Sequence, residues 1–205
     1  MINKLKFNDS TVIDIPSGFT VFCDMDGTLV DTDYANYMSY KLAVIQETSG
    51  AHDVGFTNDR LDRESLEKRL PSLTSSQLDM IADLKAKYFM ECIAETRLNM
   101  ALANLVNQYC SKNTIVLVTC CRKNRALIVL EHHKLLKCFA RLICWEDLPQ
   151  NEQSSKYKNA IKLMEVSQEA VIVFENDKRY IEEAVLAGVP KSNIYMVFLE
   201  SSGVS

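Results

Sequence analysis

The sequence contains no apolar run close to the roughly 18 residues that a membrane-spanning helix needs. Its N-terminal segment, MINKLKFNDSTVIDIP, is polar and lacks the apolar stretch of a secretory signal. The seven cysteines form an odd, scattered set without a CxxC pair, which supports neither a disulfide framework nor a zinc site. We therefore expect reduced, mostly buried thiols, no membrane partner and a cytoplasmic protein.

Positive charge and nucleotide-binding loops are also missing. The formal net charge is -4 and the sequence pI is near 5.5, which argues against a nucleic-acid partner. Neither GxxxxGK[ST] nor GxGxxG occurs, so neither a P-loop nor a dinucleotide site is indicated. A weakly acidic protein can still bind phosphate locally, which leaves small phosphorylated molecules open as partners.

Short apolar runs of the kind found in buried parallel strands recur along the chain. They are Phe19–Cys23, Thr114–Val118, Ala140–Cys144, Ala170–Phe174 and Ile194–Phe198. Helical periodicity separates the later runs, over Arg122–His133, Ser155–Val166 and Tyr180–Ala187, the last followed by Gly188 as a helix cap. This alternation predicts an α/β fold with a Rossmann-like parallel sheet and helices on both faces. A short hairpin is expected before it, from Lys4–Phe7 and Thr11–Ile15.

One section has helical periodicity only. Between about residues 32 and 94 no strand-like run occurs, and apolar spacing predicts helices around Tyr37–Ile45, Leu61–Leu70 and Ser75–Ile93. We interpret residues 31–96 as a helical cap subdomain inserted after the first core strand. Residues 1–30 and 97–205 would then form the core.

Two carboxylates, Asp24 and Asp26, directly follow the first apolar run, where ligands bind in open parallel sheets. Gly27 allows a tight turn, and the Thr28 hydroxyl can bind backbone or ligand. Such a carboxylate pair suits Mg²⁺, which prefers oxygen ligands. A calcium EF-hand loop is excluded, because its glycine and glutamate positions hold Leu29 and Ala35 here.

The DxDGT sequence Asp24–Thr28 after an apolar strand resembles the first motif of the haloacid dehalogenase (HAD) superfamily. The resemblance runs from Phe19 to Phe198, and it is to the capped subfamily of the phosphoglycolate phosphatase and β-phosphoglucomutase type. It implies a Mg²⁺-dependent phosphatase that acts on a small phosphorylated metabolite, a phosphomonoester. Asp24 would be the nucleophile that forms an aspartyl-phosphate, and Asp26 would protonate the leaving oxygen and then activate water. Gly27 and Thr28 would contribute to substrate binding.

The second and third motifs of the family also have counterparts. Thr119 ends the second core strand and would hold phosphoryl oxygens, with Cys120 and Arg122 as further substrate-binding candidates. Arg122 or its neighbour Arg125 would meet a substrate anion or form a solvated helix face. For the lysine beside the phosphate, the family pattern favours Lys156 over Lys158, although the KPxP sequence of many relatives is missing.

The fourth motif departs from the family. Glu175-Asn176-Asp177 aligns with the common E-D-S, so Asn176 replaces the aspartate that usually touches magnesium. Either the Asn176 amide oxygen or the Asp177 carboxylate would take its place. The resemblance therefore implies a set of metal ligands drawn from Asp24, Asp26, Glu175, Asn176 and Asp177.

Alternatives remain open within the resemblance. A phosphomutase or phosphonatase would use the same fold, and the neutral Asn176 suggests a catalytically weak binding or regulatory protein. In the cap, Asp33, Tyr34, Asn36 and Tyr37 are candidates for substrate choice. The sequence determines neither the substrate nor the oligomeric state.

Overall fold

The structure, a computed structural model, describes residues 2–5, 13–57, 61–148 and 155–199. The chain divides into two compact units, each taken by itself below. The first comprises Met1–Asp31 and Leu98–Ser205, and the second comprises Thr32–Arg97. Among the described residues, no helix is long and apolar enough to cross a membrane.

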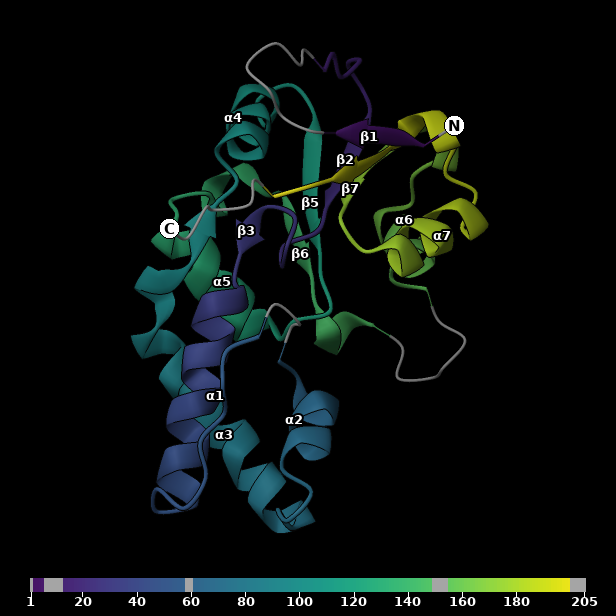
Figure 1. Cartoon of the computed structure of the whole chain (residues 1–205). Coiled ribbons are helices and arrows are strands. Elements are labelled where there is room, and N and C mark those ends of the chain that lie inside the picture. The colour runs from purple at the N-terminus through teal and green to yellow at the C-terminus, as the bar shows by residue number, and fades with distance from the viewer. Residues whose placement is uncertain (1, 6–12, 58–60, 149–154, 200–205) are drawn as a thin grey trace. The chain divides into compact units, whose positions relative to one another are not determined.

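The first unit is built on a six-stranded sheet in which all neighbours are parallel (Figure 1). In spatial order its strands are β1 (Asn3–Leu5), β8 (Ile194–Val197), β7 (Val171–Glu175), β2 (Thr20–Cys23), β5 (Thr114–Val118) and β6 (Arg141–Ile143). The apolar side chains of the three central strands, β2, β5 and β7, are buried, as expected for strands covered on both faces.

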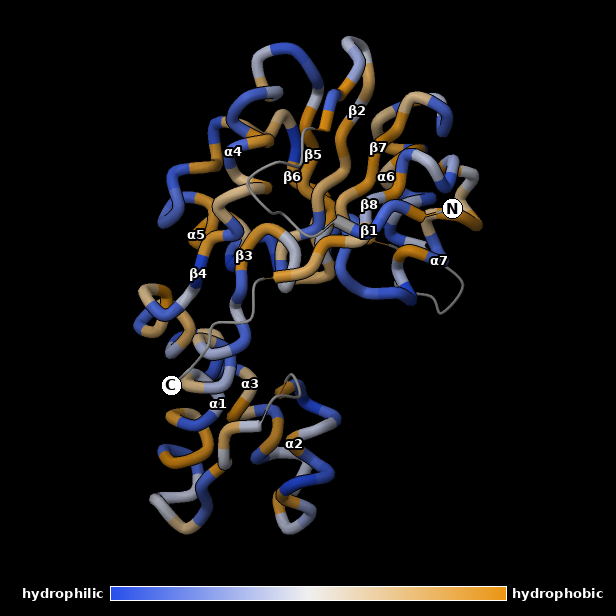
Figure 2. The backbone as a smooth tube through the Cα atoms, turned by 45° about the horizontal axis from the view of Figure 1, so that its top comes forward, coloured by the Kyte–Doolittle hydropathy of each residue, from blue (hydrophilic) through white to orange (hydrophobic). Residues whose placement is uncertain are grey.

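Four helices flank this sheet. Helices α6 (Lys156–Met164) and α7 (Lys178–Leu186) pack on one face, where Phe22 of β2 meets Tyr157 and Ile181. Helices α4 (Met100–Tyr109) and α5 (Lys123–His132) lie on the other side in both views (Figures 1 and 2). The predicted α/β fold with helices on both faces of a parallel sheet is confirmed.

Short 3₁₀-helices occur in the connections between helices and strands. They are η1 (Ile93–Glu95), η2 (Leu136–Cys138), η3 (Trp145–Asp147), η4 (Gln168–Ala170) and η5 (Lys191–Asn193). Helix α7 begins at Lys178, earlier than its apolar pattern indicates, because the Asp177 side chain accepts a hydrogen bond from the Arg179 N–H and caps the helix. Beyond its end, Gly188 takes a φ of +97°, as its predicted role as a cap requires.

The expected N-terminal hairpin is not formed as predicted. Asn3–Leu5 is a strand, but it pairs in parallel with β8, so its partner comes from the other end of the chain. Residues 6–12, which include the predicted turn, lie outside the described residues. Residues 13–15 are described and are not in a strand, and the Tyr109 hydroxyl donates a hydrogen bond to the Ile13 carbonyl.

The second unit is helical. It contains α1 (Asp33–Glu47), α2 (Arg63–Arg69) and α3 (Ser75–Glu91), with capping boxes at Asp62 and Thr74 starting the last two. Helices α1 and α3 pack along each other over a core that includes Tyr40, Val44 and Ile81. Two short strands, β3 (Val30–Asp31) and β4 (Arg97–Leu98), form a separate sheet where the chain leaves and re-enters the first unit.

The strand register sets the place of the polar residues. Cys23, the last residue of β2, is level with Leu117 of β5 and Phe174 of β7. The Asp24 N–H then donates to the Phe174 carbonyl at 3.0 Å, and the Thr119 N–H donates to the Ile143 carbonyl at 3.0 Å. The residues after β2, β5 and β7 therefore gather at one edge of the sheet.

Truncating Phe22 should test this core. Phe22 is fully buried in the central strand, and its ring stacks on Tyr157 at a centroid distance of 6.4 Å. We expect Phe22→Ala to lower the free energy of unfolding by about 3–5 kcal/mol in urea titrations. Leu186→Ala is the control, because Leu186 is 86% exposed, and it should change stability by less than about 0.5 kcal/mol. Equal effects of both substitutions would contradict the packing described.

Candidate active site

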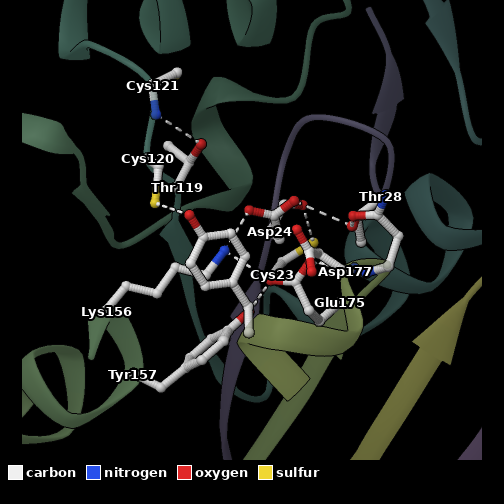
Figure 3. A network of polar contacts seen from close by, with 12 residues as sticks. Cys23, Asp24, Thr28, Thr119, Cys120, Cys121, Lys156, Tyr157, Glu175 and Asp177 are labelled. Atoms are coloured by element: carbon white, nitrogen blue, oxygen red, sulfur yellow. Dashed lines mark hydrogen bonds and ion pairs between the residues drawn. The ribbon is translucent and has the colours of Figure 1, made fainter. Parts of the chain in front are cut away.

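Asp24 is the centre of a polar network at the carboxyl ends of β2, β5 and β7 (Figure 3). The residue is buried and directly follows β2. Its Oδ1 atom lies 2.7 Å from the Lys156 ammonium, and its Oδ2 atom accepts a hydrogen bond from the Thr28 hydroxyl at 3.1 Å. Both carboxylate oxygens of Asp24 are therefore oriented by charged or polar partners.

Lys156 is the first residue of α6 and is only 3% exposed. Its ammonium lies 2.7 Å from Asp24 Oδ1 and 2.7 Å from Glu175 Oε2. The Ser155 side chain caps the helix by accepting from the Lys158 N–H, while the Lys158 side chain is exposed. The structure thus brings Lys156, and not Lys158, to Asp24.

Glu175 is fully buried at the end of β7 and uses both carboxylate oxygens inside the protein. Its Oε2 atom binds Lys156 and accepts from the Tyr157 hydroxyl at 2.8 Å. Its Oε1 atom accepts from the backbone N–H groups of Asn176 and Asp177, at 2.9 and 3.0 Å. Glu175 therefore holds Lys156 and the start of the following loop.

Two carboxylates share one ammonium here, which leaves one negative charge uncompensated in a buried place. Burial of Asp24, with the Glu175 carboxylate nearby, raises the pKa of Asp24 to about 7, although Lys156 opposes this shift. Burial disfavours the charged form of Lys156, but the Asp24 and Glu175 carboxylates outweigh it and raise the pKa of Lys156. The ammonium stays charged, and the cluster has capacity for a further cation.

The turn after Asp24 places two oxygens side by side. The Thr28 hydroxyl lies 3.1 Å from Asp24 Oδ2 and 3.0 Å from Asn176 Oδ1. A hydroxyl has one proton, so it cannot fully satisfy both acceptors. Thr28 is completely buried. Its hydroxyl therefore orients Asp24 and Asn176, whereas the sequence predicted that Thr28 contacts the substrate.

These oxygens fit Mg²⁺, which is commonly bound by one or two carboxylates and keeps several waters. A carboxylate and an amide oxygen converge on Thr28 beside the excess negative charge. Across the described ranges, no three His, Cys, Asp or Glu side chains are arranged to hold an ion by themselves. The five-residue ligand set expected from the sequence is therefore not assembled as one cluster.

Asp177, one of the five expected metal ligands, is bound to Arg179. Its Oδ1 atom accepts from the Arg179 N–H at 2.8 Å, and its Oδ2 atom pairs with the Arg179 guanidinium at 2.9 Å. Both oxygens of the Asp177 side chain are therefore bound at the start of α7, where Asp177 is the N-cap residue. Between the two alternatives left by the sequence, the Asn176 amide oxygen is the one beside Asp24.

Asp26 is buried and pairs with an arginine of α5. Its Oδ1 atom lies 2.5 Å from Nη2 of Arg125, whose side chain is largely buried. Arg122 is the exposed N-cap residue of α5. The structure therefore brings Arg125 to Asp26, whereas Arg122 stays exposed at the start of the helix, and a contact of Arg122 with substrate stays a prediction.

Thr119 and Cys120 lie at the end of β5. The Thr119 hydroxyl is buried and accepts from the Cys121 N–H at 3.2 Å, which fixes the turn beyond the strand. The Cys120 thiol donates to the Tyr180 hydroxyl at 3.2 Å, and burial raises the pKa of Cys120. Cys120 is thus a neutral thiol that lines the site.

Two tyrosines of the network escaped sequence reasoning. Tyr157 donates to Glu175, and the Tyr180 ring lies over Lys156 at 4.1 Å from its centroid. The position of Tyr157 next to Lys156 could have indicated that Tyr157 belongs to the site, although Tyr157 also fits the apolar periodicity of the helix. No sequence feature indicates a role for Tyr180, because its partners are distant in the chain.

A family model described as haloacid dehalogenase-like hydrolase matches residues 21–194. Among solved structures, a β-phosphoglucomutase from Clostridium difficile is 19% identical, with a TM-score of 0.63 and coverage of 87% of this chain and 90% of that one. CbbY from Rhodobacter sphaeroides, solved with phosphate, is 15% identical, with a TM-score of 0.65 and coverage of 90% and 96%. These likenesses show the fold. No curated protein sequence matches the chain.

Gly27 is required by this geometry. Its φ is +80°, and a Cβ atom there would lie 2.4 Å from Nδ2 of Asn176. Gly18 has a similar φ of +85° with nothing within 4 Å of a Cβ atom. Gly18→Ala should therefore measure only the backbone cost, about 1–2 kcal/mol of unfolding free energy. Gly27→Ala should cost clearly more, and adding Asn176→Ala should recover part of the difference. Equal losses for both glycines would contradict the close contact between Gly27 and Asn176.

Proposed function

The chain belongs to the haloacid dehalogenase-like hydrolases, and we propose that it is a phosphatase for a small phosphomonoester, with Asp24 as the nucleophile. The observation that carries this proposal is the buried Asp24 carboxylate, held 2.7 Å from Lys156 at the end of the central strand. A carboxylate oriented in this way, beside a fixed positive charge, is arranged to attack an anionic phosphoryl group.

In the first step a carboxylate oxygen of Asp24 attacks phosphorus. The bond between Asp24 and phosphorus forms, the bond to the leaving oxygen breaks, and Asp26, which must enter this step in its protonated form, gives that oxygen its proton. In the second step Asp26 takes a proton from water, whose oxygen attacks phosphorus and releases phosphate from Asp24. A covalent aspartyl-phosphate divides one difficult displacement into two easier ones.

The phosphoryl oxygens would be held by groups around Asp24. The Thr119 hydroxyl, the backbone N–H groups after it and the Lys156 ammonium are the donors at hand. Asp24 and Asn176 would hold Mg²⁺, which neutralises phosphoryl charge when it is bound. Asp26 is positioned by Arg125, so its carboxylate stays in one place through both proton transfers.

For the helical unit Thr32–Arg97 we propose the role of a cap that chooses the leaving group. Its residues divide by exposure. Asn36 is buried and donates to the Leu61 carbonyl at 2.5 Å, and Tyr37 is buried as well, so both stabilise the unit itself. Tyr34 and Phe56 are exposed, with ring centroids 5.8 Å apart. This exposed ring pair is the better candidate for contact with a leaving group.

Two other functions share this fold. A phosphomutase would return the phosphoryl group to a second hydroxyl of the substrate and release little phosphate. A catalytically weak binding or regulatory protein is favoured by the neutral side chain of Asn176 beside Asp24. Assays of phosphate release from sugar phosphates, nucleotides and phosphoglycolate, with and without Mg²⁺, separate these possibilities.

Asp24→Asn tests the nucleophile. We expect this change to reduce Mg²⁺-dependent hydrolysis of 4-nitrophenyl phosphate by at least about 1,000-fold, because an amide oxygen is a far weaker nucleophile. Asp83→Asn, on the exposed surface of α3, is the matched control and should retain activity. Unchanged hydrolysis by the Asp24 variant would show that another group attacks phosphorus.

Asn176→Asp tests the metal ligand. An added carboxylate next to Asp24 Oδ2 should lower the Mg²⁺ concentration for half-maximal activity by about tenfold, because ligand charge strengthens binding of a hard cation. Without Mg²⁺ the same variant should be less stable to urea, since two carboxylates then repel each other, and Mg²⁺ should restore its stability.

Asp177→Asn is the control for this measurement, because Asp177 is bound to Arg179 at the start of α7. Its Mg²⁺ dependence should remain that of the unmodified protein. A loss of Mg²⁺ dependence in the Asp177 variant alone would show that Asp177 is the ligand and would contradict the assignment to Asn176.

A further inference from the structure

Tyr180 contacts the site but has no part in the chemistry proposed above. It lies in the first turn of α7 and is partly buried. The centroid of its ring is 4.1 Å from the Lys156 ammonium, and its hydroxyl accepts from the Cys120 thiol at 3.2 Å. One side chain therefore joins α7 to the start of α6 and to the end of β5.

The surroundings of the Lys156 ammonium explain what the ring contributes. The ammonium has three N–H bonds, and the carboxylates of Asp24 and Glu175 accept two of them at 2.7 Å. The Tyr157 ring lies farther away, at 5.1 Å, and its hydroxyl is bound to Glu175. An aromatic face attracts a cation without adding a negative charge. The Tyr180 ring therefore stabilises the ammonium without increasing the charge excess of the two carboxylates.

The ring is itself held in place. Its hydroxyl is bound to Cys120, and the Arg179 guanidinium lies over the ring at 4.9 Å from the centroid. Arg179 is in turn paired with Asp177 at 2.9 Å. Because several contacts restrict it, the Tyr180 side chain presents a fixed surface to Lys156.

We propose that Tyr180 is a positioning residue for Lys156, and that its ring face holds the ammonium against the carboxylate of Asp24. The inference rests on the proposed function, in which Asp24 reacts with phosphorus. Lysine has a long flexible stem, so losing one wall of its pocket frees rotamers and admits water. The Lys156–Asp24 contact would then loosen while charge moves from Asp24 to the phosphoryl group.

Three variants separate positioning from packing. Tyr180→Phe keeps the ring and should retain most of kcat. Tyr180→Leu removes the ring and should lower kcat by between about threefold and thirtyfold, with KM changed by less than about twofold, because the lost contact acts on the reacting carboxylate. Tyr195→Leu removes a partly buried ring from β8 that stacks on Phe174, and it should leave kcat unchanged.

A second series isolates the interaction of the ring with the cation. Phenylalanine and its mono-, di- and trifluorinated forms at position 180 differ little in shape, but each fluorine withdraws charge from the ring face. We expect kcat and the urea midpoint of unfolding to fall stepwise with each fluorine. The series is made in an Arg179→Ala background, because the Arg179 guanidinium also lies over the ring. In that background the urea midpoint reports on the contact between the ring and the Lys156 ammonium even without an activity assay.

Each outcome decides the proposal. Equal loss of kcat in Tyr180→Leu and Tyr195→Leu, or a flat response of both readouts to fluorine, would overturn it. If the unmodified protein hydrolyses no phosphomonoester, the proposed function fails. A stepwise fall of the urea midpoint would then still support the hold of Tyr180 on Lys156, and a flat midpoint would refute it.

Discussion

The site depends on one buried ammonium group placed between two carboxylates. Lys156 lies 2.7 Å from both Asp24 and Glu175, at a sheet edge that water scarcely reaches. An ion pair in such a place is tolerated only when the remaining donors and acceptors have partners. Tyr157 and the backbone N–H groups after Glu175 supply them. The start of α6 and the loop after β7 are thereby tied to the central strand.

Among the described residues, the same arrangement sets two carboxylates against one ammonium, which gives an excess of negative charge at this place. The turn through Gly27 brings Thr28 to Asp24 and Asn176, so their oxygens converge where a cation would be stabilised. An aspartate in place of Asn176 would crowd a further carboxylate into this place. The neutral amide therefore reduces repulsion in the metal-free protein, at the expected cost of weaker attraction for Mg²⁺. Asp26 escapes the conflict because Arg125 compensates it separately.

Much of the fold could be predicted from the sequence because its signals are local. Buried parallel strands appear as continuous apolar runs, and all five predicted runs form strands of the sheet. The partner of β1 among the described residues is β8 from the far end of the chain, which the sequence did not indicate because a strand pattern does not specify its partner. Among the site residues, the sequence left Arg122 and Arg125 as alternatives, and only the packing of α5 decided that Arg125 pairs with Asp26.

The sequence by itself determined which residue types stand at strand ends: a carboxylate pair with Gly27 after β2, Thr119 after β5, and Glu175 closing β7. Family order made them candidates for one site. Only the tertiary structure decided their partners, by bringing Lys156 to Asp24, turning Asp177 to Arg179 and laying Tyr180 over the ammonium. The physical reason is that buried strands and backbone turns leave a pattern in neighbouring residues of the sequence. The pairing of charges depends instead on distances between segments far apart in the chain, and the spacing of residues in the sequence does not give those distances.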